Sequence, residues 1–273
     1  MTAESDGRKA AENFRSQHHL GDQPLGDLVA LIEQTTGCDV AVLDAGPDEH
    51  GMTMRDPERG AVFIAIASTA NPMRQRSTLA HELAHILFED WVPETGGVWD
   101  ERSREESRAN AFARHVLIPL DGLKVFVGRR SVDDSTLSAV VQHFLVSPHI
   151  AAIAMHQARL ISDSTKATWS AISTPNLAAR FGWSDQYRAL QGESRQRRAP
   201  QRLLARAIVG YLEGVVSLQT IAILRRVDAE TVAAELREAG ITPTDVGIEW
   251  ADPSVLPALD LDLSELEDEA GSG

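Results

Sequence analysis

Apolar residues in the first part of the chain recur at the three- and four-residue spacing of amphipathic helices. This pattern predicts helices over residues 8–20 and 25–36, and Gly37 is expected to end the second one in the left-handed conformation of a C-cap. Short apolar runs bounded by turn residues predict three strands, over residues 39–44, 51–55 and 61–67. Strands and helices in this order indicate an α+β domain with a small sheet.

Two longer helices are expected next. The first should begin near Ser77 or Thr78, which are good N-cap residues, and should run to about Phe88. A stretch with proline and glycine predicts a loop over residues 89–100, and helical spacing resumes over residues 101–118. The two helices are therefore predicted to be joined by a loop of about a dozen residues.

Beyond Pro119, which is expected to end the second of these helices, the chain is mostly helical. Residues 137–161 predict two short helices separated by a break at 146–148, and residues 199–240 predict three more. Residues 163–200 have no clear pattern. The mostly helical region therefore follows the α+β domain along the chain.

Acidic residues are concentrated at the end of the chain. The net charge is −14, and thirteen acidic residues and one basic residue from Asp228 onward account for −12 of it, which leaves about −2 for the rest. An acidic balance argues against broad binding to nucleic acid or to an anionic membrane, because both favour basic surfaces. Residues 241–273 predict a solvated and flexible tail.

The composition indicates a folded cytoplasmic protein. Hydrophobic residues make up 43% of the chain, which is enough for a sizeable core. Cys38 is the single cysteine, so we expect a reducing compartment and a small buried side chain near the start of a strand. We expect no secretory signal in residues 1–10, and the longest apolar run, at 61–67, is far too short to span a bilayer.

The segment Ala80-His81-Glu82-Leu83-Ala84-His85 carries the most informative pattern. Histidines four residues apart lie about one helical turn apart, so His81 and His85 leave the same face of the predicted helix and can bind one zinc ion. Glu82 lies beside them and is expected to act as general base for a water that the metal activates. The alternative is an exposed polar face of a surface helix.

A third ligand is needed, with a water in the fourth position of the single zinc ion. Phe88 and Trp91 stand where a longer three-histidine motif would continue, so a carboxylate from the next helix is expected instead. Glu106 is favoured because it shares a helical face with Asn110, which could orient a ligand from outside the metal's direct contacts. Glu105 lies about 100° away on that helix and Glu101 lies near its start, and both remain alternatives.

The two segments together resemble the ImmA/IrrE family of metallopeptidases. The resemblance rests on the histidine motif, on Glu106-Ser-Arg-Ala-Asn110-Ala-Phe-Ala113 and on Leu117-Ile118-Pro119, and it covers residues 10–160. It implies that Glu106, four residues before the asparagine, is the third zinc ligand. Ala84 stands where the family often has glycine, and Leu117-Ile118-Pro119 stands where it usually has Leu-Leu-Met-Pro. The resemblance implies a zincin-like fold with a small sheet.

Hydrolysis of a peptide bond also needs a donor for the tetrahedral oxyanion, usually a histidine or a tyrosine. His115 lies about half a turn off the face of Glu106 and is interpreted as a non-ligand. Tyr187 and Tyr211 are the two tyrosines, and neither belongs to a motif, so the donor is unassigned. The strand at 61–67 is either an edge that binds an extended substrate or an interior strand of the core.

Residues 137–161 and 218–240 both have the apolar spacing of a helix-turn-helix, and the resemblance implies one such unit after the peptidase domain. Recognition helices usually carry Arg or Lys toward DNA. The second helix of the first unit has only Arg159 near its end, and that of the second is acidic. Direct nucleic-acid binding is therefore not expected, and the basic segment 195–206 is either a solvated linker or a contact for an acidic partner.

These patterns predict a peptidase domain over residues 8–130, a helix-turn-helix-like segment over 131–165, a helical region over 166–240 and the tail over 241–273. The leading hypothesis is a zinc-dependent endopeptidase. By resemblance, its substrate is a helix-turn-helix repressor of a phage, a mobile element or a stress response. The alternatives are a transcription regulator or protein-interaction module with a non-catalytic metal site, and a zinc hydrolase of non-peptide amides.

Overall fold

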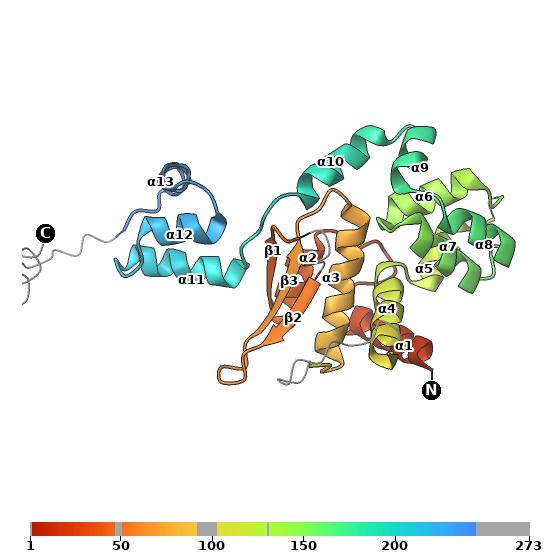
Figure 1. Cartoon of the computed structure of the whole chain (residues 1–273), viewed down its shortest axis with the longest axis horizontal. Helices are drawn as coiled ribbons and strands as arrows, with labels where there is room; N and C mark the ends of the chain where they lie inside the picture. The colour runs from red at the N-terminus through yellow and green to blue at the C-terminus, as the bar shows by residue number, and fades with distance from the viewer. Residues whose placement is uncertain (1, 47–50, 92–102, 130, 244–273) are drawn as a thin grey trace, which may run out of the picture.

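The computed structural model describes residues 2–46, 51–91, 103–129 and 131–243 (Figure 1). Most of the loop predicted at 89–100, the candidate ligand Glu101 and most of the tail predicted at 241–273 lie outside these ranges. The three predicted strands and the helical region that follows are present, so the α+β class is confirmed.

Within the ranges given above, the sheet has three strands in the order β1-β3-β2. β1 (Asp39–Leu43) pairs parallel to β3 (Val62–Ala67), and β2 (Gly51–Arg55) pairs antiparallel to β3 on its other side. β3 is therefore the interior strand, and the interpretation of residues 61–67 as a substrate-binding edge is wrong. The reason is burial: Ile64 and Ile66 are 0% and 2% exposed, whereas every residue of β2 is at least partly exposed.

The first two helices begin at side chains that cap them. α1 (Ala3–Gln17) follows Thr2, whose side chain accepts from the Ser5 amide, and α2 (Leu28–Thr36) follows Asp27, which accepts from the Ala30 amide. These caps place α1 several residues earlier, and α2 a few residues later, than the apolar spacing predicted. Gly37 ends α2 with a φ of 70°, so its predicted left-handed conformation is confirmed.

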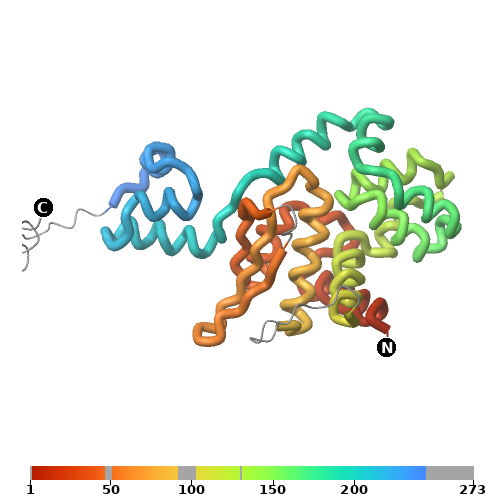
Figure 2. Tube along the Cα trace, in the orientation of Figure 1, coloured from red at the N-terminus to blue at the C-terminus, as the bar shows by residue number. Residues whose placement is uncertain are grey.

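α3 (Pro72–Leu87) begins earlier than predicted, because Asn71 rather than Ser77 or Thr78 is its N-cap. The Asn71 side chain accepts from the Arg74 amide, and proline in the first turn has the fixed φ that a helix start needs. α4 (Arg104–Leu117) follows the N-cap Ser103. α3 lies between the sheet and α4, and α1 packs against α4 (Figures 1 and 2).

Among the described residues, six further helices belong to the larger body of the protein, three of them in the part of the chain where the sequence had no clear pattern. They are α5 (Leu120–Val127), α6 (Asp134–Phe144), α7 (Pro148–Gln157), α8 (Asp163–Ser170), α9 (Thr174–Arg180) and α10 (Ser184–Ser194). α5 was not predicted and begins directly after Pro119, which serves as its N-cap. One continuous core of buried side chains extends from Ala11 to Tyr187, so α6–α10 share the core of the sheet and α3.

Three more helices in the described part of the chain have a small core of their own, set apart from the first (Figure 1). They are α11 (Gln201–Leu212), α12 (Leu218–Arg225) and α13 (Ala229–Glu238), and they match the three helices predicted over residues 199–240. Leu145 after α6 and Arg226 after α12 both have the left-handed conformation at the turn of a predicted helix pair. The domain boundaries at 130, 165 and 240 stay predictions.

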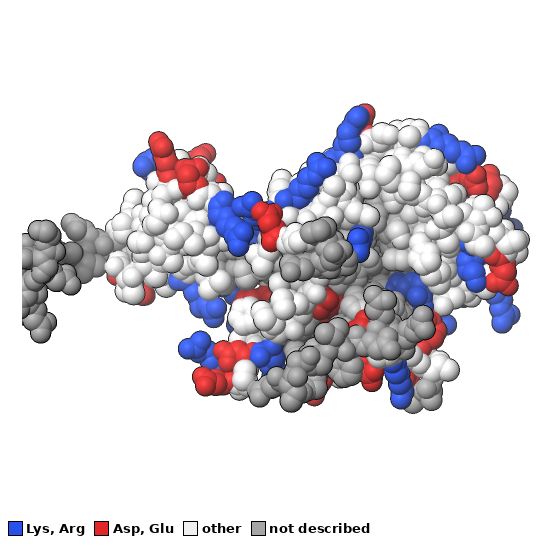
Figure 3. Space-filling view, viewed as in Figure 1, with Lys and Arg blue, Asp and Glu red and all other residues white. Residues whose placement is uncertain are grey.

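The segment that joins the two cores is attached to the sheet. Arg198 forms an antiparallel bridge with Val42 of β1, and its guanidinium donates to Asp27 at 2.7 Å. Arg197 pairs with Asp44. Basic side chains gather over this connection on the face shown in Figure 3. Two arginines of the predicted basic segment are thus paired with carboxylates of the α+β domain.

Within the described ranges, no single helix is long and apolar enough to cross a membrane. α6 and α7 reach that composition only as a pair, and they are bent by 107° at the break between them. An angle of this size is typical of a helix-turn-helix.

Candidate metal centre

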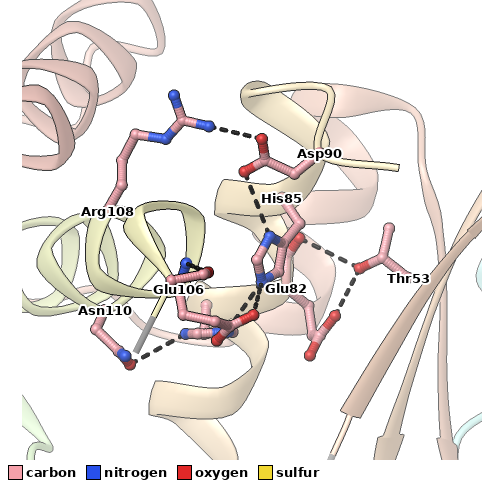
Figure 4. A network of polar contacts seen from close by, with 9 residues as sticks. Thr53, Glu82, His85, Asp90, Glu106, Arg108 and Asn110 are labelled. Atoms are coloured by element: carbon pink, nitrogen blue, oxygen red, sulfur yellow. Dashed lines mark hydrogen bonds and ion pairs between the residues drawn. The ribbon is translucent and has the colours of Figure 1, made fainter. Parts of the chain in front are cut away.

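Three side chains from α3 and α4 bring their donor atoms together (Figure 4). Nε2 of His81 lies 3.0 Å from Nε2 of His85 and 3.0 Å from Oε2 of Glu106, and Nε2 of His85 lies 3.3 Å from Oε1 of Glu106. All three donors lie within 4.8 Å of one another. Two imidazoles and a carboxylate that converge in this way could hold one metal ion.

Local sequence explains the convergence. His81 and His85 are one turn apart on α3 and emerge on the side that faces α4. Glu106 lies in the first turn of α4, where the Ser103 side chain accepts from its amide and fixes the start of the helix. Buried alanines on both helices let them approach closely: Ala80, Ala84, Ala109 and Ala113.

Glu105 is not part of this group of donors among the residues that the structure describes, and Glu101 lies outside them. Adjacent positions on a helix point about 100° apart, so a side chain at 105 leaves α4 in another direction from Glu106. The geometry therefore places Glu106, which the shared helical face favoured, beside the two histidines.

Asn110 supports the first histidine. Nδ1 of His81 lies 3.1 Å from Oδ1 of Asn110, one turn along α4 from Glu106. An amide oxygen only accepts, so this contact favours the tautomer in which Nδ1 of His81 carries the proton and Nε2 can bind a metal. The role expected for Asn110 from the sequence matches this contact.

Asp90 supports the second histidine, and sequence reasoning missed it. Its Oδ2 lies 3.4 Å from Nδ1 of His85, and its Oδ1 accepts from Arg108 of α4 at 2.6 Å. Glu89 has a φ of 55°, and this left-handed residue turns the chain back so that the Asp90 amide bonds to the His85 carbonyl at 2.9 Å. A left-handed glutamate is uncommon, so the sequence carries no signal for this reversal.

Thr53 of β2 holds the candidate general base and was also missed. Its hydroxyl donates to Oε2 of Glu82 at 2.7 Å, and Glu82 is 8% exposed (Figure 4). Gly51 leaves room for this carboxylate, because a Cβ at that position would lie 2.9 Å from Oε1 of Glu82 and 2.7 Å from the Thr78 methyl. The carboxylate is thus held on the sheet side of α3, next to the histidines.

A cleft of about 1210 Å³ opens over these groups. His81, Glu82, Glu106 and Asn110 line one part of it, and the rest is lined by Gly51 of β2, by the start of α3, by α4, α7, α9 and α10 and by segments that adjoin these helices. The candidate metal centre is therefore accessible from solvent through a space large enough for several residues of a peptide.

Of the other candidate residues, His115, Tyr211 and Cys38 lie away from the cleft, whereas Tyr187 lines it. His115 is 4% exposed and its Nε2 bonds to Glu4 of α1 at 2.8 Å, away from the converging donors. Burial lowers its pKa, an effect that Glu4 partly offsets. Tyr211 packs in the α11–α13 core, whereas Tyr187 lines the cleft. Cys38 is buried as expected, and burial raises the pKa of its thiol.

In a comparison with protein families, residues 35–156 match the IrrE N-terminal-like domain of the peptidase M78 family. No curated protein matches the chain. The matched segment contains β1–β3, α3 and α4, and with them His81, Glu82, His85 and Glu106. Residues 35–156 are therefore similar to the IrrE N-terminal-like domain of the M78 peptidases, and the match confirms the resemblance to the ImmA/IrrE family over this segment.

Proposed function

We propose that the chain is a zinc-dependent endopeptidase in which His81, His85 and Glu106 hold one zinc ion and Glu82 is the general base. The observation that carries the proposal is the position of four groups at one end of an open cleft: three converging donors and one carboxylate beside them. Two histidines and one glutamate are a donor set typical of catalytic zinc. Donors about 2.0–2.1 Å from a tetrahedral ion lie roughly 3.3 Å apart, close to the separations found here.

Zinc bound at these donors would lower the pKa of a water and polarise the substrate carbonyl. Glu82 accepts the proton that the attacking water releases and transfers it to the nitrogen of the leaving amine. Thr53 fixes the direction of the Glu82 carboxylate. Asn110 contacts Nδ1 of His81 and the Asp90 carboxylate faces Nδ1 of His85, and both rings have Nε2 turned toward the donor group.

The edge strand β2 provides a place for the substrate backbone. Its side away from β3 has no strand partner among the described residues, and Thr53 in its middle contacts Glu82. An extended peptide added to this edge would run past the general base. We therefore expect the substrate backbone to bind at the edge of β2 rather than at β3.

The protein substrate is proposed to be a helix-turn-helix repressor, from the resemblance to the ImmA/IrrE family. The match to the M78 family supports a peptidase but does not select a substrate. The rival function is a regulator or interaction module that acts through its helices and uses the metal site for structure only.

The test compares the zinc-loaded chain with Glu82→Gln, which keeps all three proposed ligands. Each is incubated with purified helix-turn-helix repressors, and new termini are identified by mass spectrometry. We expect cleavage by the wild type and none by Glu82→Gln. Equal zinc content in both with no Glu82-dependent cleavage of any repressor would favour the regulator.

The ligand assignment is tested separately by metal analysis. Glu106→Gln should lose most bound zinc, whereas Glu105→Gln on the same turn of α4 should keep one zinc ion per chain. Full zinc in Glu106→Gln would mean that another carboxylate completes the site.

A further inference from the structure

The cleft over the metal centre is completed by helices that lie outside the family segment. The match ends at residue 156, whereas α9 and α10 contribute Thr174, Pro175, Tyr187 and Gln191 to the lining, and Ile172 contributes from the segment just before α9. Tyr187 belongs to the same continuous core as the sheet and α3. Together with Ile150 and Ile153 of α7, which lie inside the matched segment, these residues form the far wall of the cleft.

This wall is fixed to the start of α3 by hydrogen bonds. The Ser194 hydroxyl donates to the Thr69 carbonyl at 2.7 Å, and the Thr69 amide donates to the Ser194 carbonyl at 3.0 Å. The side chain of Gln75 on α3 donates to the carbonyls of both Ala67 and Ser194 at 2.9 Å. At the end of α10, Gln191 donates to the Ala70 carbonyl at 2.8 Å.

Bonds between segments more than a hundred residues apart hold α10 in a defined place relative to the helix that carries the histidines. The wall is therefore part of a preformed cleft and needs no ordering step when a substrate binds. Preformed sites lose less free energy on binding than sites that must first be ordered.

One part of the wall is apolar. Ile150 and Ile153 are three residues apart on one face of α7, and Ile172 and Pro175 flank the start of α9. All four line the cleft, and the three isoleucines are only partly buried, so side-chain surface remains open.

The charged residues of the cleft argue against a basic substrate side chain at this wall. Among the described residues that line it, the carboxylates are Glu82 and Glu106, and both belong to the metal centre. The cations Arg74 and Arg114 and the side chain of His149 also line the cleft. A lysine or arginine of the substrate would find no acidic partner on the wall.

We propose that this wall, formed by Ile150, Ile153, Ile172 and Pro175, is a specificity subsite that binds a large aliphatic side chain near the peptide bond to be cut. The inference rests on the proposed function, since it places the substrate in the cleft of the metal centre. It assigns substrate selection to α7 and α9, and to α10 as the helix that holds the wall in place.

Hydroxamates test the subsite without a known substrate, because they bind zinc directly. The zinc-loaded full chain is titrated with acetohydroxamic acid and with acetyl-dipeptide hydroxamates of Leu-Leu, Gly-Gly and Lys-Lys. Burial of aliphatic side chains should make the Leu-Leu compound bind about tenfold or more tightly than the Gly-Gly compound. The Lys-Lys compound should bind no better than Gly-Gly.

Two variants assign the preference to the wall. Ile153→Asp and Pro175→Asp should each reduce the ratio of Gly-Gly to Leu-Leu dissociation constants toward one. Both should leave the affinity for acetohydroxamic acid unchanged. Pro175 is exposed, and an acidic residue in the first turn of α9 is compatible with the helix, so this variant should fold. Ile223→Asp is the matched control, because Ile223 is 65% exposed on α12.

The outcomes separate the two proposals. Equal binding of the three dipeptide hydroxamates by a chain that binds acetohydroxamic acid would overturn the subsite and leave the metal centre standing. A preference for Leu-Leu that survives in both wall variants would also overturn it. Failure of every hydroxamate to bind the zinc-loaded chain would mean that the metal is closed to ligands, and both proposals would fall.

Discussion

The Thr53 hydroxyl donates a hydrogen bond of 2.7 Å to Oε2 of Glu82 and joins the edge strand β2 to the helix that carries both histidines. The same hydroxyl lies 3.3 Å from the Glu82 backbone carbonyl. A carboxylate that transfers a proton must be held in one direction, and this contact supplies that restraint. In the proposed mechanism, Thr53 is therefore a positioning residue that acts through Glu82.

Thr53→Val should lower the turnover of any cleaved peptide by roughly 10- to 100-fold, because it removes a hydrogen bond to a charged group without changing the side-chain volume much. KM and zinc content should stay near the wild-type values. Thr53→Ser keeps the hydroxyl and should restore most of the turnover. If Thr53→Val and Thr53→Ser lose activity equally, the methyl group rather than the hydroxyl matters, and the positioning role is wrong.

The sequence predicted the donor group well because helical periodicity fixes the spacing of His81 and His85 within one segment, and the face shared with Asn110 points to Glu106. What it did not predict are contacts between segments. Thr53 reaches Glu82 only because β2 pairs with β3 in one register, with Thr53 opposite Ile64. Such pairing depends on the whole sheet and leaves no local pattern at position 53.

In the fold too, local patterns predicted the elements, whereas contacts between distant segments decide where those elements lie. Capped, periodic segments such as α6 and α7 were predicted with the right break, and β3 was predicted as a strand but not placed within the sheet. α10 had no clear apolar pattern, and its position depends on bonds between Ser194 and Thr69, which are 125 residues apart in the chain. The apolar wall of the cleft therefore emerges only from the tertiary structure.

Asp90→Ala should weaken zinc binding about 10- to 100-fold, because outer partners of ligating histidines usually contribute this much to affinity. The variant removes the carboxylate that faces Nδ1 of His85 and leaves Arg108 without its 2.6 Å partner. Competition with a chelator measures the dissociation constant. Asp121→Ala on α5 is the control, since that carboxylate is 74% exposed and pairs with Lys124. Unchanged affinity would show that Asp90 serves Arg108 alone.

Gly7→Ala should destabilise the protein by about 1–3 kcal/mol through overpacking of α1 against α4. An added Cβ would lie 2.5 Å from the Arg108 carbonyl oxygen and 2.7 Å from the Phe112 amide nitrogen, and backbone atoms cannot move aside cheaply. Gly192→Ala on α10 is the matched control, because its Cβ would meet nothing within 4 Å. That variant should gain about 0.5–1 kcal/mol from helix propensity. Urea unfolding measures both, and a stabilising Gly7→Ala would contradict the close approach of the helices.

Glu4 should make the stability of the protein sensitive to acid. Burial alone would raise the pKa of its carboxyl, but hydrogen bonds from Arg114, His115 and Gln157 outweigh burial and lower the pKa from 4.5 to about 2. The unfolded chain therefore binds a proton at higher pH than the folded chain does. The stabilisation by Glu4 is complete above about pH 4.5 and is lost as the pH falls toward 2.

Glu4→Gln should remove part of this dependence. Because the Glu4 side chain is 45% exposed, solvent screening limits the effect to about 1 kcal/mol between pH 5 and pH 3. Urea midpoints at the two pH values, measured with a chelator so that metal loss at low pH does not contribute, give the difference for each protein. Glu12→Gln on the same helix should behave as the wild type, since Glu12 forms an exposed pair with Arg8. An equal loss of stability on acidification in Glu4→Gln and the wild type would mean that the contacts of Glu4 do not contribute to the acid sensitivity.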